Sequence, residues 1–181
     1  LFALDALRFE DDSKKAVVTD IGLGMAEFSV KPELARTLIA GYNYKCRDEV
    51  CIIAAMMEIL GNRMEMLFES PRLKGTKEEI DKLKKEEKKA IHKWKNKYGD
   101  HIALLRIYKE YAKHKYDKID RRTGRIISEK VGDAKEWTKT NYLKEKILSR
   151  VKSTSKQYQR IYGRLIGISR NSQNSTNSTN S

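Results

Sequence analysis

The side chains that could carry acid–base or metal chemistry are few and far apart in this sequence. The three histidines, His92, His101 and His114, fall on different predicted helices. Asp100 directly precedes His101, and adjacent helical residues point in different directions, so we interpret Asp100 as a helix cap. For no serine or cysteine does the sequence indicate a histidine that could act as its general base. No Gly-x-x-x-x-Gly-Lys-Ser/Thr phosphate loop and no Asp-Glu-Ala-His string occurs. The sequence therefore predicts no catalytic residue, no metal ligand and no cofactor in this chain.

The two cysteines, Cys46 and Cys51, lie five residues apart. Neither a disulfide framework nor a zinc site can be assembled from this pair, so we interpret both as reduced thiols. No apolar run reaches the ~20 residues that span a bilayer, and no signal peptide opens the sequence. These features predict an intracellular protein without a membrane partner.

Basic residues outnumber acidic ones, giving a formal net charge of +13 and a pI near 9.6. The imbalance is greatest in residues 139–170, where nine Lys or Arg accompany a single acid, Glu145. Lys and Arg gain free energy by displacing counterions from phosphates, so we expect a nucleic acid as the partner. The alternative is a lysine-rich surface that only keeps the protein in solution.

Four residues of this basic segment are candidates for nucleic-acid binding: Asn141, Lys144, Arg150 and Lys152. The three cations suit phosphate groups, and the amide of Asn141 could donate to a phosphate or a sugar hydroxyl. The alternative for Asn141 is that it caps or braces a neighbouring helix. A second lysine-rich stretch, residues 82–89, has acids between its lysines and is interpreted as a solvated helix face.

Hydrophobic periodicity predicts a mainly α fold. Helices are predicted at residues 48–60, 76–98, 100–117 and 137–158. Thr76 and Glu79 have the spacing of a capping box at the start of the second. The side chains predicted to point inward from the last two are Leu104, Ile107, Tyr108, Tyr111, Trp137, Tyr142 or Leu143, and Leu148.

The first 40 residues and the segment around Gly124 give weaker signals. Leu1, Leu4 and Leu7 recur at helical spacing, and a β-branched run predicts one short strand near residues 17–19. Pro32 suits the first turn of a further helix, because its missing N–H costs nothing there. A basic turn is predicted at residues 118–125. Helix, strand and helix in this order suggest part of a small winged-helix unit.

Several stretches resemble the region that follows the motor in DEAH-box ATP-dependent RNA helicases. Residues 1–7 (Leu-Phe-Ala-Leu-Asp-Ala-Leu), 19–28 (Thr-Asp-Ile-Gly-Leu-Gly-Met-Ala-Glu-Phe) and 32–35 (Pro-Glu-Leu-Ala) look like the end of the family's winged helix. Two groups of residues resemble the helicase-associated "ratchet" domain. The first is Tyr44, Lys45, Cys46, Glu49 and 53–56, and the second is Gly99, Asp100, His101, Leu104, Leu105 and Tyr108. Its Trp-Cys-x-x-Asn-Phe-Leu segment is resembled by Trp137, Asn141, Tyr142, Leu143, Leu148 and Arg150.

The resemblance implies three regions. Residues 1–40 would be the C-terminal part of a winged-helix domain, residues 41–170 the helical ratchet domain, and residues 171–181 a disordered Asn/Ser/Thr tail. Departures from the family are Asp5 for Gly, Ser29 for Pro, Thr138 for Cys, and a longer lysine-rich stretch at 74–97. The tail stands where the family usually continues with an OB-fold.

The resemblance also implies a role. In this family two RecA-like domains bind and hydrolyse a nucleoside triphosphate such as ATP, together with Mg²⁺. The winged helix and the ratchet help to close a channel for single-stranded RNA. We therefore expect a non-catalytic accessory region that partners RNA and the motor domains of the same parent protein. The alternatives are a free-standing basic nucleic-acid-binding module and a helical protein-interaction module.

Overall fold

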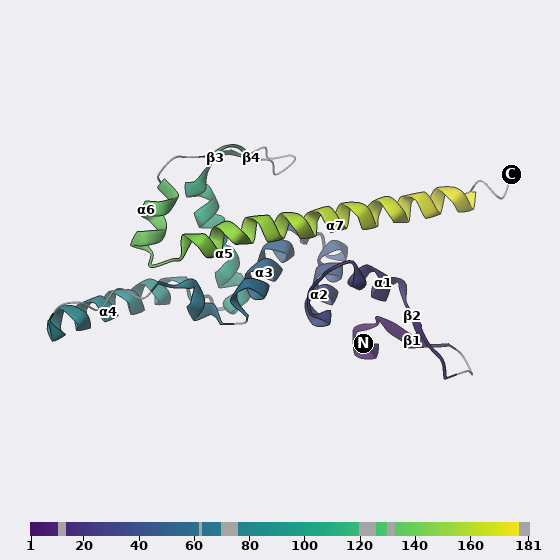
Figure 1. Cartoon of the computed structure of the whole chain (residues 1–181), viewed down its shortest axis with the longest axis horizontal. Coiled ribbons are helices and arrows are strands. Elements are labelled where there is room, and N and C mark those ends of the chain that lie inside the picture. The colour runs from purple at the N-terminus through teal and green to yellow at the C-terminus, as the bar shows by residue number, and fades with distance from the viewer. Residues whose placement is uncertain (11–13, 62, 70–75, 120–125, 130–132, 178–181) are drawn as a thin grey trace. The chain divides into compact units, whose positions relative to one another are not determined.

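The computed structural model describes the backbone of the chain apart from residues 11–13, 62, 70–75, 120–125, 130–132 and 178–181, and it describes no side chains in 116–119, 126–129 or 166–177. Helices dominate, which confirms the mainly α fold (Figure 1). The elements in order are η1 (Phe2–Leu4), β1 (Leu7–Phe9), β2 (Ala16–Val18), α1 (Asp20–Ala26), α2 (Pro32–Asn43), α3 (Arg47–Leu60), η2 (Met64–Leu67), α4 (Lys77–Trp94), α5 (Asp100–Lys115), β3 (Tyr116–Ile119), β4 (Ile126–Glu129), α6 (Asp133–Thr140) and α7 (Glu145–Asn177).

The chain folds into two compact units. The first contains residues 1–54 and 153–181, and the second contains residues 55–152. The division predicted after residue 40 falls inside α2, which continues to Asn43. Gly41 lies within this helix and does not end it. Its missing side chain lets α2 approach α3 closely, since a Cβ on Gly41 would lie 2.9 Å from Cβ of Val50. The helix ends instead at Asn43, with Tyr44 as its C-cap before Lys45, which has a φ of 56°.

An aromatic cluster forms the core of the first unit. Tyr162 of α7 meets Phe28 edge to face with ring centres 5.5 Å apart, and Tyr158 meets the same ring at 6.1 Å. The Tyr162 hydroxyl donates to the carbonyl oxygen of Leu38 in α2. All four side chains are buried. This cluster ties α7 to α2 and to the segment after α1.

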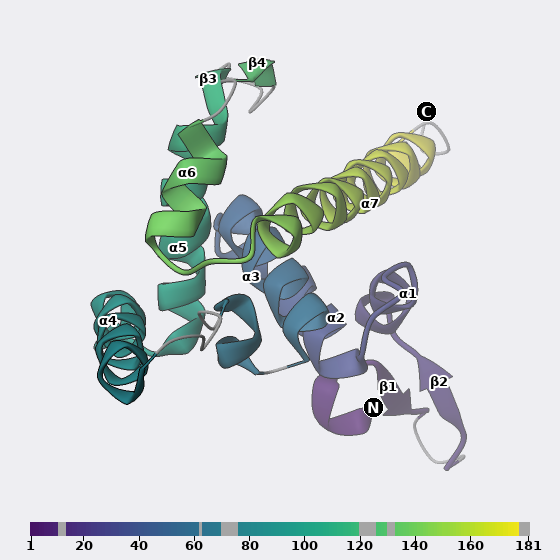
Figure 2. The same cartoon turned by 60° about the vertical axis from the view of Figure 1, so that its left-hand side comes forward.

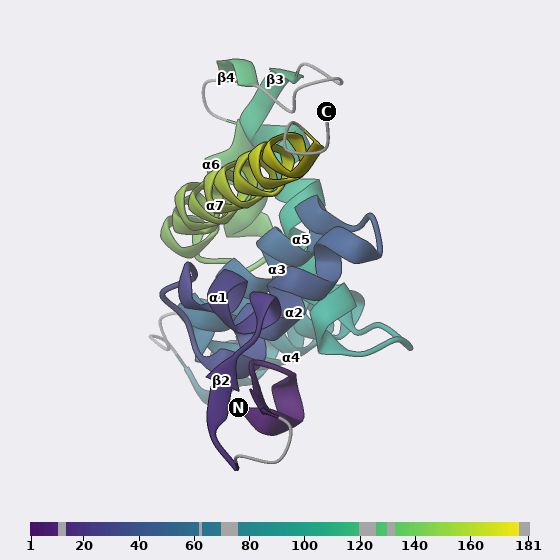
Figure 3. The same ribbon diagram turned by 90° about the vertical axis from the view of Figure 1, so that its right-hand side faces the viewer.

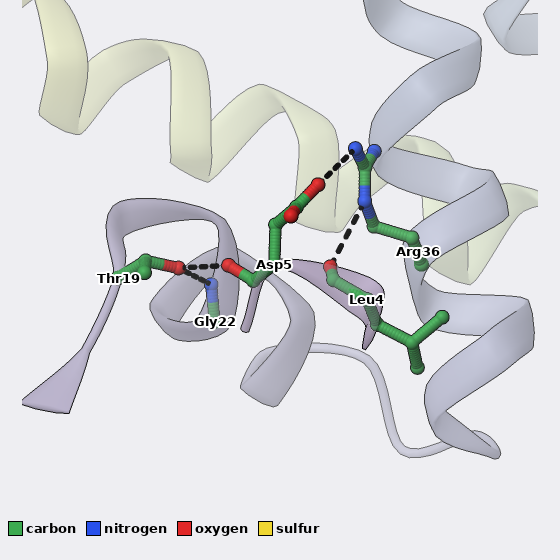
Figure 4. Close-up of polar contacts among 5 residues, drawn as sticks. All are labelled: Leu4, Asp5, Thr19, Gly22 and Arg36. Carbon is green, nitrogen blue, oxygen red and sulfur yellow. Dashed lines mark hydrogen bonds and ion pairs between the residues drawn. The ribbon is translucent and has the colours of Figure 1, made fainter. Parts of the chain in front are cut away.

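A polar network holds the N-terminal turn against α1 and α2 (Figure 4). Arg36 donates from Nε to the carbonyl oxygen of Leu4 at 3.1 Å and from Nη2 to Oδ2 of Asp5 at 3.3 Å. Thr19 donates to the Asp5 carbonyl oxygen and accepts from the Gly22 N–H at 3.0 Å, which caps α1. Gly22 is required here because a Cβ would lie 2.2 Å from the carbonyl oxygen of Ala6.

Strands β1 and β2 form an antiparallel hairpin near the N-terminus (Figure 3). The register pairs Leu7 with Val18 and Phe9 with Ala16, so one face carries four apolar side chains. Phe9 is 61% exposed, Val18 is 56% exposed, and the ring of Phe2 stacks on Phe9 at 4.5 Å. This face therefore lies open to solvent among the described residues.

The hairpin corrects the prediction of a helix through Leu1, Leu4 and Leu7. Only the 3-10 turn η1 forms there, because Asp5 takes a left-handed conformation with a φ of 57° and turns the chain into β1. The strand predicted near residues 17–19 exists, as β2, but the prediction of a single strand is wrong. β3 and β4 form a second antiparallel hairpin after α5. The basic turn predicted at 118–125 lies outside the described residues from 120 on.

In the second unit α5 is the central helix, with α6 packed along it (Figure 2). The four side chains predicted to point inward from α5 are buried, namely Leu104, Ile107, Tyr108 and Tyr111. The capping box predicted for Thr76 and Glu79 forms at the start of α4. Trp94, at the end of α4, is 4% exposed.

The single helix predicted at 137–158 is instead two helices, α6 and α7, separated by residues 141–144. Tyr142 in this connector has a φ of 54°, a left-handed conformation that no α-helix accommodates. Helix α7 runs to Asn177, and residues 178–181 lie outside the described part, so a disordered tail at 171–181 stays a prediction.

Candidate nucleic-acid interface

The α6–α7 connector, residues 141–144, is held in place by the segment around η2. Leu143 forms an antiparallel β-bridge with Phe68. The N–H of Glu69 donates to the Tyr142 carbonyl at 2.7 Å, and the N–H of Lys144 donates to the Leu67 carbonyl at 2.9 Å. The N–H groups of Tyr142 and Leu143 still bond to the last turn of α6, but the Tyr142 carbonyl and the Lys144 N–H pair with the distant segment, and this breaks the helix. They also fix where α7 begins.

Asn141 lies inside the unit rather than on its surface, with 7% of the residue exposed. Its Nδ2 donates to the Trp137 carbonyl at 2.8 Å, and its Oδ1 accepts from Nζ of Lys93 in α4 at 3.1 Å. These contacts correspond to the bracing role that was the alternative to RNA contact. The amide ties the end of α6 to the end of α4.

Three aromatic rings surround the same point. The ring of Trp137 packs edge to face on Trp94 at 5.9 Å and stacks on His114 of α5 at 5.1 Å. Of the two inward candidates in the connector, Leu143 is the buried one, and Leu148 at the start of α7 is fully buried. Trp137 itself is half-buried. The predicted inward positions therefore anchor both sides of the break.

The structure places the three candidate cations at different points of the second unit. Nζ of Lys144 donates to the Met66 carbonyl at 3.0 Å. Arg150 is exposed on α7, whereas Lys152 is half-buried and, two residues further on, points away from Arg150. Lys146 is exposed four residues before Arg150 and so shares its face. Sequence reasoning did not single out Lys146, although its i, i+4 spacing from Arg150 was visible.

Two acids near this segment have identified partners. Glu145, the single acid of residues 139–170, accepts from Nζ of Lys115 in α5 at 3.1 Å. Oε2 of Glu86 accepts from the Tyr142 hydroxyl at 3.3 Å. Burial, and then the negative charge of Glu86, raise the pKa of the Tyr142 hydroxyl, so it stays protonated as a donor at neutral pH. Lysines and arginines outnumber acids along residues 139–170, which gives this segment a net positive charge.

In the part of the chain that the structure describes, no three His, Cys, Asp or Glu side chains are grouped so as to hold a metal ion. No helix within that same part has both the length and the apolar character needed to cross a membrane.

Comparison with known proteins gives a consistent set of matches. Residues 31–104 match the family described as "Helicase associated domain (HA2), ratchet-like". The chain is 25% identical over 158 residues to the ATP-dependent RNA helicase DHX33 of Mus musculus, covering 87% of this chain and 18% of that protein. The human DHX33 is 23% identical over the same length and coverage. The probable ATP-dependent RNA helicase DHX35 of Homo sapiens is 29% identical over 117 residues, covering 65% of this chain and 14% of that protein. The chain thus spans less than a fifth of the length of these relatives.

Proposed function

Since this chain carries a ratchet-like helicase-associated domain and is homologous to DEAH-box RNA helicases, we propose that it forms one side of a single-stranded RNA channel and couples strand movement to the motor. In this proposal the chain performs no chemistry itself. ATP and Mg²⁺ act in RecA-like domains of the parent protein, and residues 1–40 are the end of its winged helix. Support for this wider role comes from the names of the relatives, all ATP-dependent or probable ATP-dependent RNA helicases.

The observation that carries the proposal is the surplus of Lys and Arg over acids at the start of α7. Glu145 is neutralised by Lys115, while Lys144, Lys146 and Arg150 gather on and before the first two turns of the helix. Lys144 and Arg150 contact RNA phosphates in this proposal, whereas Lys152, half-buried and pointing away from Arg150, lies outside this surface. The amide of Asn141 does not reach the strand but holds the connector from which α7 starts.

Phosphate contacts have a measurable signature, which a double variant tests. Replacing Lys144 and Arg150 with Ala should weaken binding to single-stranded RNA similarly for all sequences. Each lost contact should also flatten the dependence of log affinity on log salt by about one unit. The measurement is a salt titration of affinity by fluorescence anisotropy, with the whole chain and labelled oligouridine and oligoadenosine as probes.

A matched control removes the same formal charge at two cations outside the proposed RNA surface, each with an identified carboxylate partner. Lys113 pairs with Glu110 at 2.6 Å, and Arg164 pairs with Glu27 at 3.5 Å. Replacing Lys113 and Arg164 with Ala should leave the salt slope close to that of the unaltered chain. If both double variants flatten the salt slope equally, Lys144 and Arg150 are ordinary solvated surface residues and the proposal is wrong.

A further inference from the structure

Lys93, the penultimate residue of α4, is a cation that the proposed RNA surface does not yet include. The residue is exposed, yet its ammonium is held at two points. Nζ lies 3.1 Å from Oδ1 of Asn141 and 5.2 Å from the centre of the Trp94 ring. Asn141 in turn is buried and fixed to the Trp137 carbonyl. A surface lysine is normally mobile, so this one is unusual in having a defined position.

The partners of Lys93 and Lys144 differ in kind from those of the neighbouring lysines. Lys93 donates to an amide oxygen and Lys144 to the backbone carbonyl of Met66, and both acceptors are neutral. Lys113 and Lys115 instead donate to carboxylates. Neither Lys93 nor Lys144 forms an ion pair with any residue whose side chain the structure describes. An ammonium has three N–H donors, so each keeps its full charge and two donors after binding its neutral anchor.

We infer that Lys93 and Lys144 are a pre-positioned pair of phosphate-binding lysines, and that Asn141 is the positioning residue that holds Lys93 ready. This inference rests on the proposed RNA function and assigns it a contact on a second element, α4. A lysine already anchored loses less side-chain entropy when it binds than a mobile one. A neutral anchor fixes the position of the ammonium without neutralising its charge, whereas a carboxylate does both.

Asn141→Asp tests this distinction directly, because it keeps the anchor but gives it a negative charge. The aspartate would pair with Lys93 and compensate its charge. The variant should therefore resemble Lys93→Met, with affinity for labelled oligouridine reduced by at least about threefold at low salt and a slope flatter by about one unit. Lys93→Arg, which keeps the charge, should retain the slope. Lys93 is exposed, so its variants test the inference even if Asn141→Asp disturbs the fold.

Two controls separate a local effect from a change in net charge. Gln157→Glu makes the same amide-to-carboxylate change at an exposed position of α7, and Lys113→Met removes a lysine that already has a carboxylate partner. Both should leave the slope unchanged within error. Circular dichroism and the thermal midpoint of each variant show whether its fold is intact.

The outcomes distinguish this inference from the proposed function. If Lys93→Met leaves both affinity and slope unchanged while the Lys144 and Arg150 double variant flattens the slope, the inference is overturned and the proposed function stands. If neither changes the slope, both are overturned. A flatter slope for Lys93→Met and Asn141→Asp, with Lys93→Arg and the controls unaffected, supports the inference.

Discussion

The contact between α2 and α3 leads to a prediction in which the same substitution has opposite effects at two glycines. In the first unit, Gly41 of α2 faces Val50 of α3, and an added Cβ would lie 2.9 to 3.2 Å from the three side-chain carbons of Val50. Gly163 is in the interior of α7, and a Cβ there would have no neighbour within 4 Å among the described residues. We expect Gly41→Ala to destabilise the unit and Gly163→Ala to stabilise it.

The magnitudes follow from two effects. Replacing a helical glycine by alanine stabilises a helix by about 1 kcal/mol, and Gly163→Ala should show this gain alone. Gly41→Ala has the same gain but adds a methyl group to a filled contact, which costs about 1–3 kcal/mol. The nearest atom of Val50 is its branched Cβ, which is fixed to the backbone. It therefore cannot rotate away from an added methyl group, as the tip of a long side chain could. The net effect at Gly41 should be a loss of about 1 kcal/mol, so the two variants should differ by about 2 kcal/mol.

Urea unfolding followed by circular dichroism measures both variants. Val50→Ala and the double variant with Gly41→Ala complete a mutant cycle, and the smaller side chain should recover most of the loss at Gly41. A Gly41→Ala protein as stable as Gly163→Ala would refute the reasoning, since it would show that α2 and α3 do not meet at this glycine. Absence of coupling with Val50→Ala would place the loss elsewhere.

Three further predictions concern buried polar groups. Tyr162→Phe removes the hydroxyl that donates to the Leu38 carbonyl and should lower the free energy of unfolding by about 1 kcal/mol, measured in urea. Cys46 is half-buried and Cys51 fully buried, so Ellman's reagent should modify Cys46 alone in the folded chain and both thiols in urea; rapid reaction of both when folded would contradict this. Burial raises the pKa of Cys51 from 9.0 to about 12 and that of Tyr108 from 10.0 to about 12. The folded chain then holds these protons more tightly than the unfolded chain, so the urea midpoint should fall as pH rises from 9 towards 12, and a constant midpoint would count against this burial.

Local rules were sufficient where neighbours in sequence determine the structure. The apolar spacing of Leu104, Ile107, Tyr108 and Tyr111 predicts a buried helix face, because a helix that packs on one side must place its apolar groups there. The capping box at the start of α4 is equally local, since its two side chains are three residues apart. The resemblance to a ratchet-like domain rests on similar short patterns, and the family match over residues 31–104 agrees with it.

Distant contacts account for what the sequence did not reveal. Trp137 and Leu148 fit one continuous helix, but pairing of Leu143 with Phe68 interrupts it. Asn141 meets Lys93 across 48 residues of sequence, so the sequence alone left open whether its amide binds RNA or braces a neighbouring helix. Sequence reasoning placed Lys93 on α4 without a role, because nothing in its own neighbourhood indicates a neutral anchor.

The open apolar face of the β1–β2 hairpin has a practical consequence for handling the chain in solution. Phe9 and Val18 are largely exposed on a two-stranded sheet whose outer backbone edges can pair with another strand. Concentrated preparations of the free chain should therefore self-associate, and thermal unfolding should become less reversible as protein concentration rises. A charged residue in place of Val18, such as Val18→Lys, should improve solubility at little cost in stability, because the replaced side chain is mostly in water already.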